Sequence, residues 1–169
     1  MRPPSAAPPE APAPALPIRP ATPGDLAAVA ALVEAIANAT YGHLFRGDPP
    51  RPEGKWAQSL LALQGDRLVG VVIADEDWIE DLWVLADCRG QGLGRRLLGA
   101  GEARIAAAGH ELAHLRVIAE NQDARRFYAR CGWSEVETYP HETWGFPMID
   151  MIKRVGTGSS AGVSVACPL

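Results

Sequence analysis

Apolar and polar positions along the first third of the chain change their spacing in a way that predicts a strand and then a helix. Residues 16–22 form a short apolar run typical of a strand, and Thr22 with Asp25 resembles a helix-opening capping box. The following positions predict an amphipathic helix over roughly residues 23–38. Its apolar face consists of Leu26, Val29, Leu32, Val33 and Ile36.

The rest of the chain predicts strands and helices in mixed order. Two apolar runs around Gln64-Gly65-Asp66 indicate a hairpin over residues 59–74. Residues 78–85 have the aromatic and branched composition of a strand, and they precede "RGQGLG" and a helix over roughly residues 93–108. Further segments predict a strand at 112–119, a helix at 122–131, and strands at 134–139 and 148–154. The fold class is therefore α/β, with mixed element order.

Composition limits the size of the fold. The chain has 169 residues, 47% hydrophobic and 21% charged, which fits one globular domain of ordinary size. Nine of the 15 prolines fall within residues 1–23, so we expect residues 1–15 to be a disordered Pro/Ala-rich tail. Residues 155–169 carry no charge and predict a C-terminal tail, which leaves residues 16–154 as the domain.

Charge and cysteine content exclude several classes of protein. Sixteen Lys and Arg against 20 Asp and Glu give a net charge of −4, which argues against a nucleic-acid partner. No apolar run approaches the length of a membrane span, and the proline-rich start is unlike a secretory signal, so we expect a cytoplasmic protein with no membrane partner. The three cysteines and four histidines lack metal-ligand spacing, and we expect no metal.

The glycine turn over residues 89–94 is the strongest candidate for ligand binding. It lies between a strand and a helix, where glycines expose backbone amides at a positive helix end and favour an anion such as a diphosphate. A Walker loop does not fit, because Arg95 and Arg96 follow Gly94 in place of Lys and a hydroxyl residue. A dinucleotide fingerprint fails as well, because Arg95 stands where it requires a third small residue.

Two spaced motifs resemble those of the Gcn5-related N-acetyltransferase (GNAT) superfamily. The first motif is [QR]-x-x-G-x-[GA], which "RGQGLG" matches through Arg89, Gly92 and Gly94. The second, 27 residues downstream, is matched by Asn121, Ala124, Phe127, Tyr128, Gly132 and Trp133. The resemblance covers roughly residues 16–154 and implies a mixed twisted sheet of about six to seven strands flanked by helices. Within the family, the segment around Glu80 looks closest to small-molecule amine acetylators.

The resemblance implies acetyl-CoA as co-substrate and assigns residues to it. Backbone amides between Gly90 and Arg95 would face the pyrophosphate, and the pantetheine arm would pair with the strand like an added strand. The cofactor-binding residues are then Leu82, Trp83, Val84, Arg89, Gly90, Gln91, Gly92, Leu93, Gly94, Arg95, Asn121 and Ala124.

Three residues are candidates for the acetyl-transfer chemistry. Tyr128 lies seven positions after Asn121, which returns it to within about 20° of the same helix face. The resemblance implies that this phenol protonates the departing thiolate. It also implies that Glu80 acts as the base at the acceptor amine, with Asp81 as an amine-binding anion. Strand alternation predicts that Glu80 and Asp81 point to opposite faces.

The acceptor is expected to be the primary amine of a small molecule. Five carboxylates within residues 75–81 favour a cationic amine, such as a diamine or polyamine, over an anionic acceptor. Tyr41, Trp78 and Trp144 are candidate walls of its pocket, and His114 is a reserve base. Two alternatives remain open: a protein N-terminal or lysine acetyltransferase, and a non-catalytic acyl-CoA-binding regulatory module. A monomer and a homodimer are both compatible with the sequence.

Overall fold

A computed structural model of the protein describes residues 15–45 and 55–156. Most of the predicted tails, residues 1–14 and 157–169, and the proline-rich segment at 46–54 lie outside the described residues. The strands are β1 (Ile18–Pro20), β2 (Ser59–Gln64), β3 (Arg67–Asp75), β4 (Trp78–Val84), β5 (Leu112–Ile118), β6 (Ser134–Pro140) and β7 (Pro147–Arg154). The α-helices are α1 (Leu26–Tyr41), α2 (Leu93–Ala107) and α3 (Gln122–Arg130), and 3-10 turns lie at Pro23–Asp25, Gly42–Leu44, Trp56–Gln58 and Ala86–Cys88.

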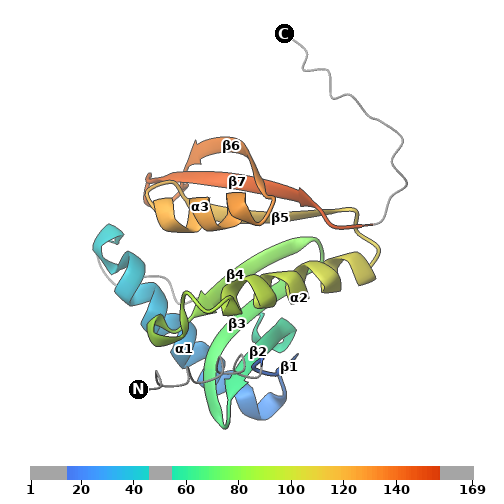
Figure 1. Cartoon of the computed structure of the whole chain (residues 1–169). Helices are drawn as coiled ribbons and strands as arrows, with labels where there is room; N and C mark the ends of the chain where they lie inside the picture. The colour runs from blue at the N-terminus through green and yellow to red at the C-terminus, as the bar shows by residue number, and fades with distance from the viewer. Residues whose placement is uncertain (1–14, 46–54, 157–169) are drawn as a thin grey trace, which may run out of the picture.

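All seven strands join one sheet in the order β1-β2-β3-β4-β5-β7-β6. Every neighbouring pair is antiparallel except β4 and β5, which are parallel. The mixed sheet predicted from the sequence is therefore confirmed. In Figure 1, β5, β7 and β6 lie with α3 in one part of the molecule, and β1 to β4 lie with α2 in the other.

The helices cover both faces of the sheet, because alternate residues of β3 face opposite ways. Val71 and Ile73 pack with Val29 and Val33 of α1 on one face. Val72 and Ala74 pack with α2 on the other face, in a core that extends to Ala124 and Phe127 of α3. At Gly101 of α2, an added Cβ would lie 2.8 Å from Ile79 Cδ1 and 3.1 Å from Val72 Cγ2, so glycine lets the helix approach β4 this closely without displacing these buried side chains.

The start of α1 follows the predicted capping box. The backbone N–H of Thr22 donates to Asp25 Oδ2 at 2.7 Å, and Arg19 forms two hydrogen bonds to the same carboxylate. Together these contacts hold the pKa of Asp25 well below its usual range. The helix continues to Tyr41, about one turn beyond the predicted end, and this extra turn brings Tyr41 towards the C-terminal half of the sheet.

The parallel strands β4 and β5 pair only at their first residues. Trp78 pairs with His114 and Ile79 with Leu115, and the ladder then stops although β4 continues to Val84 and β5 to Ile118. We call this divergence the fork. Beyond it, the edge of β4 that faces β5 has no strand partner in the part of the chain that the structure describes.

A β-bulge in β4 lies at the start of the fork. Ile73 of β3 is opposite Asp81, while Ala74 is opposite Ile79, so Glu80 is an extra residue without its own partner. A bulge interrupts the alternation of side chains along a strand. The regular alternation on which the predicted opposite orientation of Glu80 and Asp81 depends is therefore interrupted here, and both residues line the same cavity.

Candidate active site

A cavity of about 690 Å³ occupies the fork. Its walls come from β4, from the start of α2, from the end of β5 and from one face of α3, with Thr40 and Tyr41 of α1 closing one side. All predicted site residues line it except Gln91 and Leu93. The side chain of Leu93 is buried in the core, and Gln91 Nε2 donates to the backbone oxygen of Asp87, so these two residues offer the cavity only their backbone.

The start of α2 presents a set of hydrogen-bond donors. Gly90 and Gly92 have φ values of 75° and 79°, a left-handed conformation that favours glycine, and an added Cβ on either would meet open space. Among the described residues, no backbone or side-chain acceptor receives the N–H groups of residues 90–95. Unpaired amides at a positive helix end are suited to an anion with several oxygen atoms.

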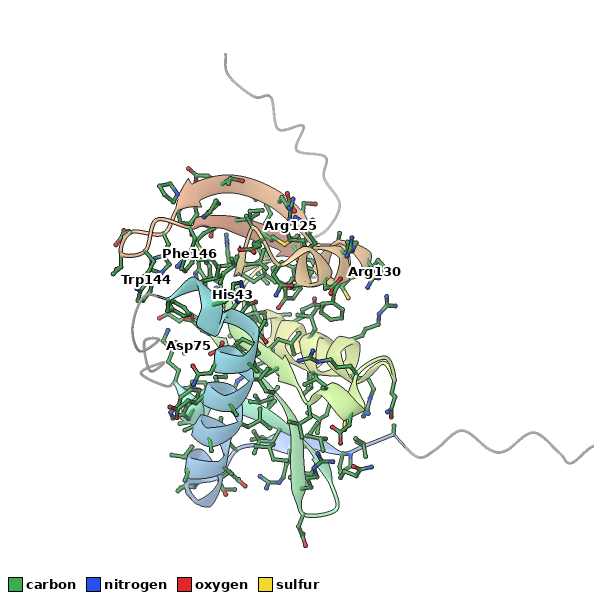
Figure 2. The ribbon with its side chains drawn as sticks, turned by 90° about the vertical axis from the view of Figure 1, so that its left-hand side faces the viewer. His43, Asp75, Arg125, Arg130, Trp144 and Phe146 are labelled. Atoms are coloured by element: carbon green, nitrogen blue, oxygen red, sulfur yellow. The ribbon has the colours of Figure 1, made fainter. Side chains whose placement is uncertain are left out.

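Arginines add positive charge around these amides. Arg89, Arg95 and Arg130 line the same end of the cavity, and Arg89 Nε donates to the backbone oxygen of Val84 at 3.0 Å. Arg96 lies elsewhere, since its guanidinium donates to the backbone oxygen of Leu16. In Figure 2, Arg130 lies on one side of the molecule and His43, Trp144 and Phe146 lie on the other. The basic end of the fork is thus separate from the side of the molecule that carries His43, Trp144 and Phe146.

Tyr128 of α3 and Tyr41 of α1 meet the cavity from two helices. Asn121 links them: its Oδ1 accepts from the backbone N–H of Ala124 at 3.0 Å and caps α3, while its Nδ2 donates to Tyr41 Oη at 2.6 Å. Burial raises the pKa of Tyr128, and the nearby Tyr41 and Asp81 add to this rise. The Tyr128 phenol is therefore protonated at neutral pH and able to donate a hydrogen bond.

Asp81 is the carboxylate most altered by its surroundings. Burial raises the pKa of Asp81 to about 6, although the indole N–H of Trp83 donates to it at 2.9 Å and partly opposes the rise. The charge of Glu80 adds a smaller upward contribution. A buried carboxylate with a pKa near neutrality, inside a cavity, is suited to accepting and releasing a proton.

Glu80 has a different environment. Its carboxylate accepts from Lys55 Nζ at 2.7 Å, and the same ammonium lies 2.7 Å from Asp75. These two acids raise the pKa of Lys55 through their hydrogen bonds. Glu80 is more open to solvent than Asp81 and already has a cationic partner, so part of the predicted acidic field is neutralised by the chain itself.

A family profile described as an acetyltransferase (GNAT) domain matches residues 50–155. The chain belongs to this family. The glycine turn, the fork and α3 all lie within the matched residues.

Individual relatives are more distant. The chain is 34% identical over 85 residues to the aminoalkylphosphonate N-acetyltransferase of Salmonella typhimurium, and that match covers 44% of this chain and 55% of the relative. The chain thus spans about half the length of the curated relative that it matches.

Solved structures of this family share the fold. The structure of yncA from Salmonella typhimurium with its cofactor acetyl-CoA has a TM-score of 0.66 at 15% identity, covering 89% of this chain and 99% of that one. The ribosomal-protein-alanine N-acetyltransferase from Brucella melitensis has a TM-score of 0.67 at 19% identity, covering 82% of this chain and 99% of that one.

The structure also clarifies the other sequence-based candidates. Of the three proposed pocket aromatics, Tyr41 lines the cavity, Trp78 stacks on His114, and Trp144 packs between loops against Phe146. Among residues 15–45 and 55–156, no group of three or more His, Cys, Asp or Glu side chains has the arrangement of a metal site. In the same segments, no helix combines the length and hydropathy needed to cross a bilayer.

Lys55 and Arg116 are among the site residues that the sequence analysis missed. Lys55 follows a proline-rich segment and had no motif to mark it, although it binds Glu80. Arg116 lies on β5 and lines the cavity, whereas its sequence context is an ordinary strand with one exposed charge. Only the fork reveals Arg116, because the fork turns the end of β5 into a wall of the cavity.

Proposed function

We propose that this protein transfers the acetyl group of acetyl-CoA to the primary amine of a small molecule. The observation that carries this proposal is the fork itself. One cavity joins the unpaired amides of residues 90–95, the free edge of β4, and the pair of titratable groups Asp81 and Tyr128. Transfer to an amine needs an anchored donor, a base and an acid. The amides and the edge of β4 would anchor the donor, and Asp81 and Tyr128 would serve as base and acid.

The residues present fit acetyl-CoA. The amides of residues 90–95 would bind its diphosphate, with Arg95 and Arg130 supplying further charge. The free edge of β4, from Leu82 to Val84, would pair with the amide groups of the pantetheine arm in the manner of an added strand. When bound, acetyl-CoA supplies a thioester whose carbonyl carbon is open to attack by an amine.

The geometry favours Asp81 as the base. An alkylammonium must lose a proton before it attacks, and a carboxylate with a pKa of about 6 is largely ionised at pH 7.5 and available to take it. The sequence-based assignment of the base to Glu80, with Asp81 binding the amine, remains a prediction. Because Glu80 already binds Lys55, we propose Asp81 rather than Glu80 as the base.

Tyr128 is proposed as the acid. Its raised pKa keeps the phenol protonated, and it lies on the wall of the cavity close enough to Asp81 for that carboxylate to contribute to the rise. The ammonium loses its first proton to Asp81, which passes it to solvent, and the attacking nitrogen loses a second proton, which replaces the one that Tyr128 gives to the thiolate, so one proton is released per turnover. Net transfer is then an amide and a free thiol.

A small-molecule acceptor is supported by the curated relative, whose name says that it acts on aminoalkylphosphonates. The ribosomal-protein-alanine N-acetyltransferase of similar fold keeps a protein acceptor as an alternative. A thiol-release assay with acetyl-CoA tests the proposal. An amine panel and a peptide panel should be compared at equal concentration. Turnover with small amines supports the proposal, turnover only with peptides favours the alternative, and CoA binding without turnover indicates a regulatory module.

A further inference from the structure

Arg116 occupies a special position at the fork. The last paired residues of the two strands are Ile79 and Leu115, so the first residues beyond the ladder are Glu80 on β4 and Arg116 on β5. Both line the cavity. Because paired strands lie about 5 Å apart and rise about 3.3 Å per residue, the backbones of Arg116 and Asp81 start within about 10 Å of each other.

The Arg116 guanidinium is held in place from several sides. Its central carbon lies 5.3 Å from the ring centre of Trp78 on β4 and 5.6 Å from that of Tyr139 on β6. Its Nε donates to Asp150 Oδ1 at 3.1 Å, and the hydroxyl of Tyr139 donates to the same oxygen at 2.7 Å. Aromatic faces and a carboxylate on Nε fix the plane of the guanidinium before any ligand arrives.

This fixation leaves the outer part of the guanidinium available. The side chain of Arg116 is 50% exposed, and among the described residues its hydrogen bond to Asp150 uses only Nε. The two terminal nitrogens of a guanidinium can bind carboxylate or phosphate-like oxygens through parallel hydrogen bonds. An arginine whose only task was to bind Asp150 would not need to line the cavity.

Asp150 forms an ion pair with Arg116, whereas other acids near the cavity face cationic partners or imidazole nitrogens of their own. Glu80 and Asp75 share the ammonium of Lys55, and Asp77 lies 3.6 Å from His114 Nε2. Asp150 accepts only from Nε, so the terminal nitrogens of Arg116 have no acceptor among the described residues. Asp81 therefore remains as the carboxylate in the cavity that has no cationic partner among the described residues.

We propose that Arg116 binds an anionic group, a carboxylate or a phosphonate, on the same acceptor whose amine is deprotonated at Asp81. This inference rests on the proposed acetyl transfer and narrows its acceptor to short aminoalkyl acids. Arg116 is then a specificity-determining residue. It also reverses the sequence-based expectation of diamines or polyamines, because the second ammonium of a diamine would meet the guanidinium of Arg116.

Paired acceptors test the anionic group directly. Thiol release is measured with 2-aminoethylphosphonate against ethylamine, and with 3-aminopropanoate against propylamine, so that each pair differs only in the anion. We expect kcat/KM to be about ten-fold or more higher for the acid of at least one pair, a difference typical of a charge-assisted contact. The phosphonate and carboxylate arms distinguish the two anions. A preference for putrescine or for the neutral amines overturns the assignment.

Arg116→Gln tests the residue. It should raise KM for the preferred acid about ten-fold or more and change kcat/KM for the neutral amine less than about two-fold. Arg154→Gln is the matched control, because it removes the same charge from an exposed pair with Glu111 outside the cavity. Arg116→Lys keeps the charge but not the planar guanidinium, so we expect an intermediate KM for the acid. This variant carries the test if Arg116→Gln does not fold.

The outcomes separate the two proposals. Turnover of neutral amines and acids alike, with equal losses in Arg116→Gln, leaves acetyl transfer in place and overturns only the role of Arg116. Absence of thiol release with every small amine overturns both. A rise in KM confined to the acids supports both.

Discussion

The side-chain amide of Asn121 donates a 2.6 Å hydrogen bond to the hydroxyl of Tyr41, 80 positions earlier in the chain. This bond connects the start of α3 with the end of α1, and so connects two walls of the cavity that come from opposite faces of the sheet. It holds the helix of Tyr128 at a fixed distance from the helix that closes the fork. A short polar contact thus sets the position of a proposed acid.

Removing this hydrogen bond should cost stability. Tyr41→Phe leaves the Asn121 amide without its partner, and we expect the free energy of unfolding to fall by about 1 kcal/mol. Urea denaturation of Tyr41→Phe, Asn121→Ala and the double variant gives the coupling energy between the two side chains. A coupling near zero would show that the contact adds nothing to the folded state.

Substitutions in the glycine turn should act through the backbone conformation and not through steric clashes. Gly92→Ala places a side chain on a residue with φ 79°, so we expect a loss of about 1 kcal/mol and a clear loss of CoA affinity. Gly99→Ala is the control, because Gly99 is helical with open space around it, and alanine there should stabilise by up to about 1 kcal/mol. Thermal unfolding with and without CoA measures both effects. An unchanged CoA shift in Gly92→Ala would remove the turn from the binding site.

Tyr128→Phe should separate binding from chemistry. The ring keeps its packing against Phe127 and Trp133, so the fold and CoA affinity should remain close to those of the wild type. The loss of the phenol should lower kcat about ten-fold or more, as expected for a general acid. Full turnover in this variant would show that the thiolate leaves without help and that Tyr128 serves only packing.

Ionisation of Asp81 should determine the acidic limb of the pH–activity profile. Activity should fall as the pH drops through about 6, where Asp81 takes up a proton and no longer accepts one from the amine. Asp81→Asn should remove most of the activity. Glu80→Gln should lower the midpoint of the acidic limb only slightly, because the charge of Glu80 contributes less than burial to the raised pKa of Asp81. If Glu80→Gln instead abolishes the acidic limb while Asp81→Asn keeps it, the base is Glu80, as the sequence suggested.

The same carboxyl group should make stability depend on pH. The pKa of Asp81 is raised in the folded state, so its favourable contribution is complete below the unfolded value of about 3.9 and is lost as the pH rises through about 6. Asp81→Asn should therefore stabilise the protein at pH 8, by roughly 2 kcal/mol, and have little effect at pH 4. Denaturation at both pH values checks this. Equal effects of Asp81→Asn on stability at pH 4 and pH 8 would show that burial does not raise the pKa of Asp81.

Local sequence patterns predicted the elements well because each pattern has a local cause. Helical spacing of Leu97, Leu98 and Ile105 fixes α2, and the glycines of the turn fix the backbone before it. The motifs at 89–94 and 121–133 then placed two segments that are far apart in the chain at one site, and both segments line the cavity. These features depend on neighbours within a few residues, so a single sequence reveals them.

The missed features depend on pairing between distant strands. The bulge at Glu80 follows from the register of β4 against β3, and no residue in "WIEDLWV" signals it. Without the bulge, alternation placed Glu80 and Asp81 on opposite faces. The role of Arg116 likewise requires the early end of the β4–β5 ladder, which is a property of the whole sheet. Register is a global quantity, and sequence periodicity alone does not determine it.

The open edge of β4 has a consequence for the behaviour of the protein in a crowded solution. A strand edge with free amide and carbonyl groups usually invites another chain to pair with it and begins aggregation. Here the free edge lies inside the sheet, between β4 and β5, with α2 and α3 on its flanks, whereas the outermost strands are β1 and β6. The gap between β4 and β5 can therefore keep unpaired backbone ready for a slender ligand without itself offering a template for self-association.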